Sequence, residues 1–416
     1  MNDVKGKRLL ILGGTTLMIN VVKQAQAMGV YTIVTDVSPN SPAKMFSDAR
    51  FDISTGDMDA LEKLAKEQKV DGVFTGYDDF NTSIAVELCG RLGLPFYASK
   101  EQIEITKNKD QFKANCKKFG VPVVKEYTGE NVQFPCVVKP VDSYSAKGIT
   151  ICNTVEELEE GILFALQFSK SRKFIIEKYM SPTNAECVNI DYVLIDGNII
   201  LSAVGDKKVV NQGNKAPLTS AVFYPSKHID EYVKCVDQNV KQMFKHLGMK
   251  NGTVFIESFY DEDGFSIYEM GYRVGGGQSS ILLDSLCNVD YVKMLIRFAL
   301  TGSMHVGSDL PEIDPLIQKY AVGLVRLAKP GRIEKICGIE QVKAIDGVIN
   351  ITQYLHEGDC VADNLLGTLG QTFARMHILA DSVDSLNEKI SNIQDCLHAY
   401  DSNGHDLMLE NTVKYE

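Results

Sequence analysis

Two glutamates in the middle of the chain are spaced so that a β-hairpin would bring their carboxylates face to face. Residues 253–260 and 265–270 alternate apolar and polar side chains, and the turn between them ends in Gly264, which tolerates a positive φ. If the loop has three residues and Gly264 is its last, counting back in steps of two sets Glu257 opposite Glu269. The spacing therefore predicts a pair of facing carboxylates.

This pairing would put two like charges among apolar side chains. The expected neighbours on that face are Phe255, Phe259, Phe265 and Ile267. Facing carboxylates repel and are costly to remove from water unless a cation bridges them, so the pair predicts a magnesium site. The alternative is a different turn register, with one glutamate solvated and the other in an ion pair.

Two further segments carry residue types that suit phosphate groups. Arg273 and the glycines 275–277 follow the hairpin and supply a cation and an adaptable backbone. Earlier in the chain, Lys139 ends an apolar strand, where a bare ammonium is costly without an anion. The loop after it offers amides, hydroxyls and one cation, from Ser143, Ser145, Lys147 and Gly148. A surface hairpin would explain that loop equally well, but it would not explain Lys139.

The elements around these residues predict an α/β protein. The first hundred residues alternate strand and helix, which is typical of a parallel sheet covered on both faces. Gly13 and Gly14 could bring amides to an anion there, and Asp36 suits either a ribose or a turn cap. Tyr77, Asp78 and Asn81 follow a strand of this sheet and are candidates for substrate contact, with N-capping by Asp78 or Asp79 as the alternative.

Composition limits the classes of partner. Against 43 Lys and Arg the chain has 54 Asp and Glu, a formal net charge of −11, which argues against nucleic acid or an anionic membrane. The ten cysteines include no CxxC pair, and the histidines show no HExxH spacing. No apolar run is long enough to span a bilayer. We therefore expect a cytoplasmic protein that acts on small molecules, with a homodimer as the default assembly.

Taken in order, the motifs of the chain resemble the ATP-grasp superfamily. They are NKDQFK at 108–113, VVKPVDSYSAKGI at 137–149, IIEKYM at 175–180, and the acids of FIESF and IYEMGYR. Their order is most similar to the branch of biotin carboxylase, carbamoyl phosphate synthetase and the purine-biosynthetic ligases. The resemblance implies a Rossmann-like preATP-grasp domain at 1–105, a two-lobed ATP-grasp domain at 106–305 with a flap at about 121–188, and a small β-rich C-terminal domain at 306–416.

The resemblance also assigns roles to single residues. It implies phosphate binding by Lys109 and Lys139, a mobile phosphate loop at 143–148, and a ribose contact at Glu186. The adenine hinge would consist of Glu177, Lys178, Tyr179 and Met180. Glu257 and Glu269 match acids that bind Mg²⁺, with Mn²⁺ as an alternative cation, and Arg273 matches an arginine near the transferred phosphate. Either Lys207 or Lys208 matches a basic residue on the sheet before the acids.

The activity that the resemblance implies is ATP-dependent carboxylate–amine ligation through an acyl phosphate. Lys139, Lys147 and Arg273 would then neutralise phosphate charge during catalysis. One position departs from the family, because Gly271 stands where members commonly carry an asparagine that helps to hold a second magnesium. This departure motivates the alternative of an ATP-binding regulatory or accessory protein with reduced catalysis. An NAD-dependent enzyme built on the first domain leaves Lys139 and both glutamates unexplained.

Overall fold

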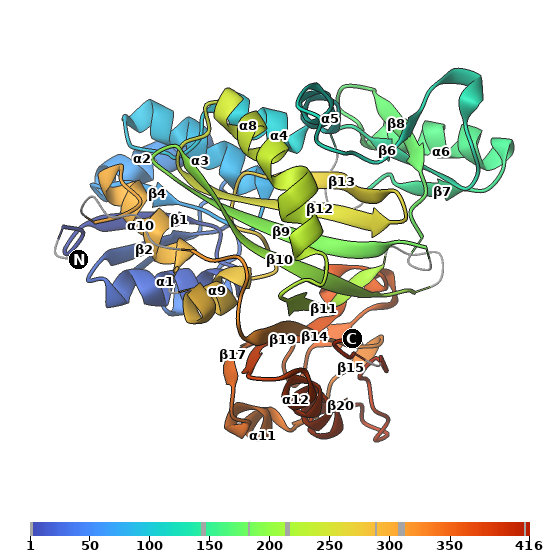
Figure 1. The fold of residues 1–416 in the computed structure, drawn as a ribbon. Coiled ribbons are helices and arrows are strands. Elements are labelled where there is room, and N and C mark those ends of the chain that lie inside the picture. The colour runs from blue at the N-terminus through green and yellow to red at the C-terminus, as the bar shows by residue number, and fades with distance from the viewer. Residues whose placement is uncertain are drawn as a thin grey trace.

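The computed structural model describes residues 3–142, 147–181, 184–212, 217–287, 289–306, 313–411 and 413–416. Its mixed α/β architecture confirms the expected fold class, with three main sheets (Figure 1). In the described residues, no helix is both long and apolar enough to cross a membrane.

The first sheet is parallel, with strand order β3-β2-β1-β4. Its strands are β1 (Arg8–Leu12), β2 (Tyr31–Thr35), β3 (Ala49–Phe51) and β4 (Gly72–Phe74). The helices of this region are α1 (Met18–Ala27), α2 (Met58–Glu67), α3 (Asp79–Leu92) and α4 (Lys100–Lys107). The central strands are almost wholly apolar because helices cover both of their faces. Asp78 caps α3 through the backbone N–H of Asn81, which fixes the start of this helix at the carboxyl end of β4.

A second, antiparallel sheet with order β5-β8-β6-β7 forms a separate layer within the segment expected to be the flap. It consists of β5 (Glu126–Tyr127), β6 (Cys136–Pro140), β7 (Thr150–Cys152) and β8 (Phe174–Lys178), packed against α6 (Val155–Phe168). Helix α5 (Lys109–Lys118) precedes it. The sheet begins and ends at neighbouring points of the backbone, because the Lys178 N–H donates to the Lys125 carbonyl oxygen at 2.9 Å.

The third sheet has eight strands and runs through the middle of the molecule in the order β13-β12-β9-β10-β11-β14-β19-β17. Its first five strands are β9 (Glu186–Ile195), β10 (Asn198–Val210), β11 (Leu218–Tyr224), β12 (Gly252–Asp261) and β13 (Gly264–Gly271). Asp196 and Gly197 both have positive φ, as a tight hairpin between β9 and β10 requires. The associated helices are α7 (Ile229–Tyr232), α8 (Gln238–His246), α9 (Ser279–Cys287) and α10 (Tyr291–Thr301).

The C-terminal strands extend this same sheet instead of forming a sheet of their own. The larger ones are β14 (Tyr320–Leu327), β17 (Val348–Gln353) and β19 (Thr372–Ala380). Four short strands form two-stranded ribbons beside them: β15 (Gly331–Arg332), β16 (Lys335–Cys337), β18 (Cys360–Val361) and β20 (His398–Tyr400). Helices α11 (Ile339–Ala344) and α12 (Val383–Cys396) complete the region, and α12 packs on one face of β14 and β19.

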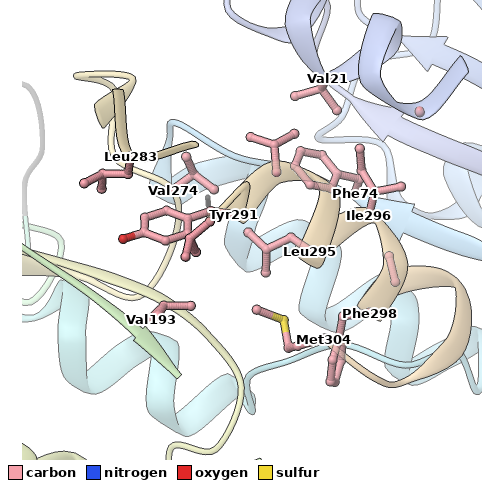
Figure 2. Packing of buried hydrophobic residues seen from close by; sticks show 14 of the residues in the cluster. Val21, Phe74, Val193, Val274, Leu283, Tyr291, Leu295, Ile296, Phe298 and Met304 are labelled. Carbon is pink, nitrogen blue, oxygen red and sulfur yellow. The ribbon is translucent and has the colours of Figure 1, made fainter. Parts of the chain in front are cut away.

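The first sheet and the eight-stranded sheet share one apolar core. Figure 2 shows Phe74 of β4 and Val193 of β9 on either side of Leu295 and Ile296 of α10, all of them buried. Because this core spans both sheets, it fixes the carboxyl ends of the first sheet against the segment that follows β13.

The hairpin of β12 and β13 has the expected carboxylate pairing but reaches it by a different register. Its loop is one residue shorter than expected, since Asp261 pairs with Gly264, which has φ +92°. A β-bulge between Glu257 and Ser258 on β12, where β13 carries the extra Tyr268, shifts the register back. Glu257 therefore still faces Glu269.

The bulge corrects one expectation about the surroundings of this pair. The extra residue reverses the alternation on β13, so Phe265 and Ile267 lie in the core cluster that contains Ile256, on the opposite face. Their place beside Glu257 is taken by Tyr268, which stacks on Phe259 with ring centroids 4.5 Å apart.

Candidate active site

The two facing glutamates have different surroundings. The Lys207 ammonium donates to Glu257 at 2.5 Å, and the Tyr268 hydroxyl donates to the same carboxylate. Desolvation acts to raise the pKa of Glu257, but the charge of Lys207 and these hydrogen bonds outweigh it and hold the pKa below its ordinary value. Desolvation and the neighbouring charge of Glu257 instead raise the pKa of Glu269. The pair is therefore a charged glutamate held by the protein and a second one with spare capacity for a cation.

The register also decides between the two candidate lysines. Lys207 faces the glutamates, whereas Lys208 points to the surface and pairs with Glu416 at 3.0 Å.

The flap and α5 supply a second set of charges. The buried carboxylate of Glu177 on β8 accepts from Lys139 of β6 at 2.6 Å and also from Lys113 of α5. These two ammoniums lower the pKa of Glu177, against the effect of burial. Burial lowers the pKa of Lys109 at the start of α5, while Glu269 and Glu177 act in the opposite direction.

These two sets of charges face each other. The Lys139 ammonium lies 5.9 Å from the centroid of the Tyr268 ring, whose hydroxyl binds Glu257. The charge of Lys109 is coupled to both Glu269 and Glu177. The structure thus brings the lysines predicted from the flap and helix α5 to the carboxylate pair predicted from the hairpin.

The expected hinge segment combines a fixed polar end with an apolar surface. Lys178 pairs with Asp261 at 3.1 Å, which ties the end of β8 to the turn of the β12–β13 hairpin. Two residues later Met180 is buried in a small cluster of apolar and aromatic side chains, with Val124, Ala185, Phe259 and Tyr268. These side chains are apolar or aromatic, as contact with an aromatic base requires. Glu186 begins β9 beyond them and is bound by Lys227 and His228.

Arg273 links the end of the hairpin to the first sheet. Its Nε and Nη2 donate to the two oxygens of Asp79, at 2.6 and 3.1 Å, and its guanidinium carbon lies 4.8 Å from the centre of the Phe255 ring. Asp79 is the first residue of α3. The planar fork of arginine suits this bidentate contact, and the pair neutralises the charge of Arg273 in the absence of a ligand.

Phe255 also explains the glycine at position 271. The two residues are direct cross-strand partners, and a Cβ at Gly271 would lie 2.2 Å from Cε1 of the Phe255 ring. Arg273 covers the same ring. An asparagine at this position would therefore require the ring to move.

The structure describes only part of the predicted phosphate loop. Ser143 and Ser145 lie outside the described residues. Lys147 is exposed, and Gly148 has φ +77° and is enclosed by Phe168 and Pro140.

Of the two alternatives given for Asp36, its contacts favour the turn cap. The Asp36 carboxylate accepts from the backbone N–H groups of Gly14 and Ser38, at 2.8 and 2.9 Å, so it closes its own loop. A Cβ at Gly14 would lie 2.5 Å from the Ser41 side chain. Asp36 and Gly14 therefore serve the local fold.

Sequence reasoning missed three residues of the site. Lys113 stands four residues after Lys109 on the same helix, and that spacing was the available signal. Tyr268 reaches Glu257 only because of the bulge, which the sequence does not announce. Asp79 lies in the YDDF segment, but its contact with Arg273 could not be predicted from local spacing, because the two residues are almost two hundred positions apart.

The described residues contain no group of three or more His, Cys, Asp or Glu side chains that could hold a metal ion by themselves. Two carboxylates are nevertheless enough for Mg²⁺, which commonly completes its octahedron with water and substrate phosphates.

Residues 132–281 match the model of the ATP-grasp domain. The formate-dependent phosphoribosylglycinamide formyltransferase of Ignicoccus hospitalis is 24% identical over 361 residues, 82% of this chain and 86% of the relative. The enzyme of the same name from Sulfurisphaera tokodaii is 27% identical over 187 residues, 42% of this chain and 47% of the relative. The match thus spans about half the length of that relative.

The crystal structure of L-amino acid ligase from Bacillus licheniformis superposes with a TM-score of 0.76 at 19% identity, covering 96% of this chain and all of the other. This likeness concerns the whole fold, including the first sheet and the C-terminal strands. The chain contains an ATP-grasp domain, and its fold is that of the ATP-grasp superfamily.

Proposed function

We propose that the protein is an ATP-dependent ligase that joins a carboxylate to an amine, with release of ADP and phosphate. The observation that carries the proposal is that Lys109 and Lys139 lie beside the facing pair of Glu257 and Glu269. Lysines opposite a carboxylate pair suit a polyphosphate with its magnesium, and the apolar surface at Met180 suits the adenine.

The proposed ligand placement follows the charges. Glu269, with Glu257, would hold Mg²⁺, which would offset the charge on the phosphate oxygens. Lys109 and Lys139 would bind the phosphates, with Lys147 and the phosphate loop closing over them. Glu177 would act as a positioning residue, because its carboxylate is already engaged by Lys113 and Lys139 and holds both ammoniums in place. The backbone at Met180 would contact the adenine edge, and Glu186 the ribose.

The reaction proceeds in two steps. An oxygen of the substrate carboxylate attacks the γ-phosphorus of ATP. The bond between this phosphorus and the β,γ-bridging oxygen breaks, which releases ADP and forms an acyl phosphate. The amine nitrogen then attacks the acyl carbon, loses a proton and expels inorganic phosphate, which leaves an amide. Arg273 is placed to stabilise the transferred phosphate once the ligand competes with Asp79 for its guanidinium. The protein mainly positions the reactants and keeps water away from the acyl phosphate.

Replacement of Glu269 by glutamine tests this assignment. The variant keeps the size of the side chain but removes a metal-binding charge, so substrate-dependent ADP release should fall by two or more orders of magnitude. The matched control is Glu262→Gln, an exposed residue of the same hairpin, which should leave ADP release unchanged. Screening amino acids, small carboxylates and bicarbonate in the wild type supplies the substrates.

A second candidate function rests on Gly271 and Phe255. Because the ring occupies the space of an asparagine side chain, a protein that binds ATP for regulation and does not turn it over is the competing assignment. That protein would lose metal-linked ATP affinity in Glu269→Gln and would show no ADP release with any pair in the screen. Turnover with any carboxylate and amine pair decides for the ligase.

A further inference from the structure

Arg375 is a cation that forms no ion pair within the described part of the chain. It lies on β19, where one guanidinium nitrogen donates to the carbonyl of Gly276 and Nε is buried without an acceptor. Arg375 forms no salt bridge with any residue that the structure describes, whereas Arg273 is neutralised by Asp79. A guanidinium drawn out of water and lacking a counter-ion is costly unless a ligand supplies the anion.

Arg375 and the glutamate pair lie on the same face of the eight-stranded sheet. Directly paired residues of neighbouring strands share a face, as do residues two positions apart. The pairs that connect the two ends are Glu257–Asn189, Asn189–Gly205, Lys207–Val222, Val222–Gly323 and Gly323–His377. Arg375 is two residues before His377 on β19, so it faces the same side as Glu257.

Three parts of the chain meet at the segment 274–278, where the Gly276 carbonyl accepts a hydrogen bond from Arg375. Tyr77 comes from the first domain, Gln278 from the segment after Arg273, and Tyr354 from the C-terminal region. The Tyr77 N–H donates to Val274 at 3.1 Å, and the Tyr354 hydroxyl lies 3.5 Å from Oε1 of Gln278. Tyr77 and Gln278 both have positive φ, at 73° and 57°. Non-glycine residues in this conformation are strained and concentrate at functional sites.

The charges at this junction suit a single negative charge. Burial lowers the pKa of His377 to about 3, so the imidazole beside Arg375 is neutral. The phenols of Tyr77, Tyr224 and Tyr354 have pKa values raised mainly by burial and act as neutral hydrogen-bonding groups. The carboxylates that act on them are Asp290 beside Tyr77 and Asp191 beside Tyr224, and neither forms a salt bridge with Arg375. A phosphate monoester carries close to two negative charges and calls for more than one cation, whereas a carboxylate matches one arginine.

We propose that Arg375, with Tyr77 and Tyr354, binds a substrate carboxylate that takes no part in the reaction. One substrate therefore carries this anchoring carboxylate and is not a sugar phosphate. This inference rests on the proposed ligase function and names the substrate class at the same site. The anchoring carboxylate comes either from an α-amino acid whose amine attacks, or from a dicarboxylate of which the other end is activated.

The test compares Arg375→Gln with the control Arg332→Gln, which changes an exposed arginine of the C-terminal region. Substrates are the twenty amino acids and the C3 to C5 dicarboxylates, each with its amide analogue, and ribose 5-phosphate serves as the phosphate probe. In the wild type, one carboxylate class should support ADP release, and its amide should have a KM about 10- to 100-fold higher. Arg375→Gln should raise the KM of the carboxylate by the same factor and leave the KM for ATP and the KM of the amide unchanged.

A purely structural role gives a different pattern. If Arg375 only fixes the backbone at Gly276, the variant will impair carboxylate and amide equally, and the proposal fails. It also fails if ribose 5-phosphate, which can bind but cannot be ligated, stabilises the ATP-analogue complex more than any of the carboxylates does. Amino acids and dicarboxylates separate the two sources of the carboxylate.

A binding assay keeps this inference separate from the proposed ligase. Thermal stabilisation of the ATP-analogue complex by the carboxylate needs no turnover, and Arg375→Gln should abolish it. If the wild type releases no ADP but its carboxylate binding is lost in Arg375→Gln, the proposed ligase function fails and the anchoring role of Arg375 stands. If the wild type releases ADP and Arg375→Gln changes neither this release nor the binding of the carboxylate, the ligase function stands and the anchoring role of Arg375 fails.

Discussion

At the scale of single residues, Gly271 shows how a departure from a family pattern is fixed by one neighbour. Phe255 fills the space that a side chain would need, and Arg273 lies over the same ring, which limits how far the ring can move. The lack of a side-chain amide at position 271 is thus coupled to the packing of Phe255 and Arg273. Replacing Gly271 alone leaves the Phe255 ring in the space that the new side chain needs.

Gly271→Asn should therefore destabilise the protein by about 1–3 kcal/mol, because overpacking of a buried site forces side chains out of their preferred conformations. The free energy of unfolding in urea measures this loss. The control is Gly90→Ala in α3, where a Cβ would meet nothing within 4 Å and the helix should be stabilised slightly. An unchanged unfolding free energy for Gly271→Asn would show that Phe255 yields without cost.

Asp191 is a residue-scale test of the electrostatics on the same face of the sheet. Burial raises its pKa to about 7, although it accepts hydrogen bonds from Asn189 and Ser279 at 2.9 and 3.2 Å. The folded state therefore binds a proton that the unfolded chain releases near pH 4. Since the folded state binds more protons between these values, its stability falls as the pH rises from about 4 to 7.

Asp191→Asn removes this titration and keeps an acceptor of the same shape. The stability of the wild type relative to the variant should fall between pH 5 and pH 8, as measured by urea unfolding at each pH. Asp381→Asn, at an exposed position, should show no such trend. Parallel curves for wild type and Asp191→Asn would mean that Asp191 is ionised throughout.

At the scale of elements, Glu177 joins the flap to helix α5. Its carboxylate lies between Lys113 of the helix and Lys139 of β6, and all three side chains have little contact with solvent. Breaking a buried ion pair by removing one partner leaves uncompensated charge and typically costs about 3–5 kcal/mol. The contact therefore sets both the stability of this junction and the position of Lys139.

Glu177→Gln should lower the free energy of unfolding by about 3 kcal/mol and raise the Kd for ATP, measured by calorimetry. Glu159→Gln, an exposed change on α6 of the same flap, is the control for both quantities. If Glu177→Gln weakened neither stability nor ATP binding, the two lysines would be positioned by other contacts.

At the scale of the whole molecule, strands that lie far apart in the sequence belong to the same sheet. The strands after position 305 complete the central sheet, so β11 would become an exposed edge without them. The flap, in contrast, has its own sheet and leaves and rejoins the chain at neighbouring backbone positions, with the Lys178 N–H bonded to the Lys125 carbonyl oxygen.

A chain that ends at residue 305 should therefore be insoluble or unfolded, because it exposes the edge of β11 and the apolar face carrying Phe223. A chain in which a short glycine linker replaces 126–178 should stay folded, provided that Lys113→Met removes the lysine orphaned by the deletion. Circular dichroism and thermal unfolding distinguish the two. A folded, soluble 1–305 chain would show that the C-terminal strands form an independent unit.

The sequence by itself determined the local elements and the residue types of the site. The alternation of strand and helix predicted the parallel sheet of the first hundred residues, and Gly264 was predicted to end the turn of the hairpin. It also predicted the facing glutamates, although the loop length was wrong by one residue and the bulge at Tyr268 compensated for it. These features follow from interactions within a few residues, which a sequence pattern records.

Only the tertiary structure decided which distant side chains meet. The pairing of Arg273 with Asp79, of Glu177 with Lys113, and the uncompensated charge of Arg375 all depend on how separate sheets pack. Such contacts join residues far apart in the chain, and their energy depends on burial and on the direction of each side chain. Neither quantity is contained in local spacing, so the chemistry of the residues could be predicted while their partners could not.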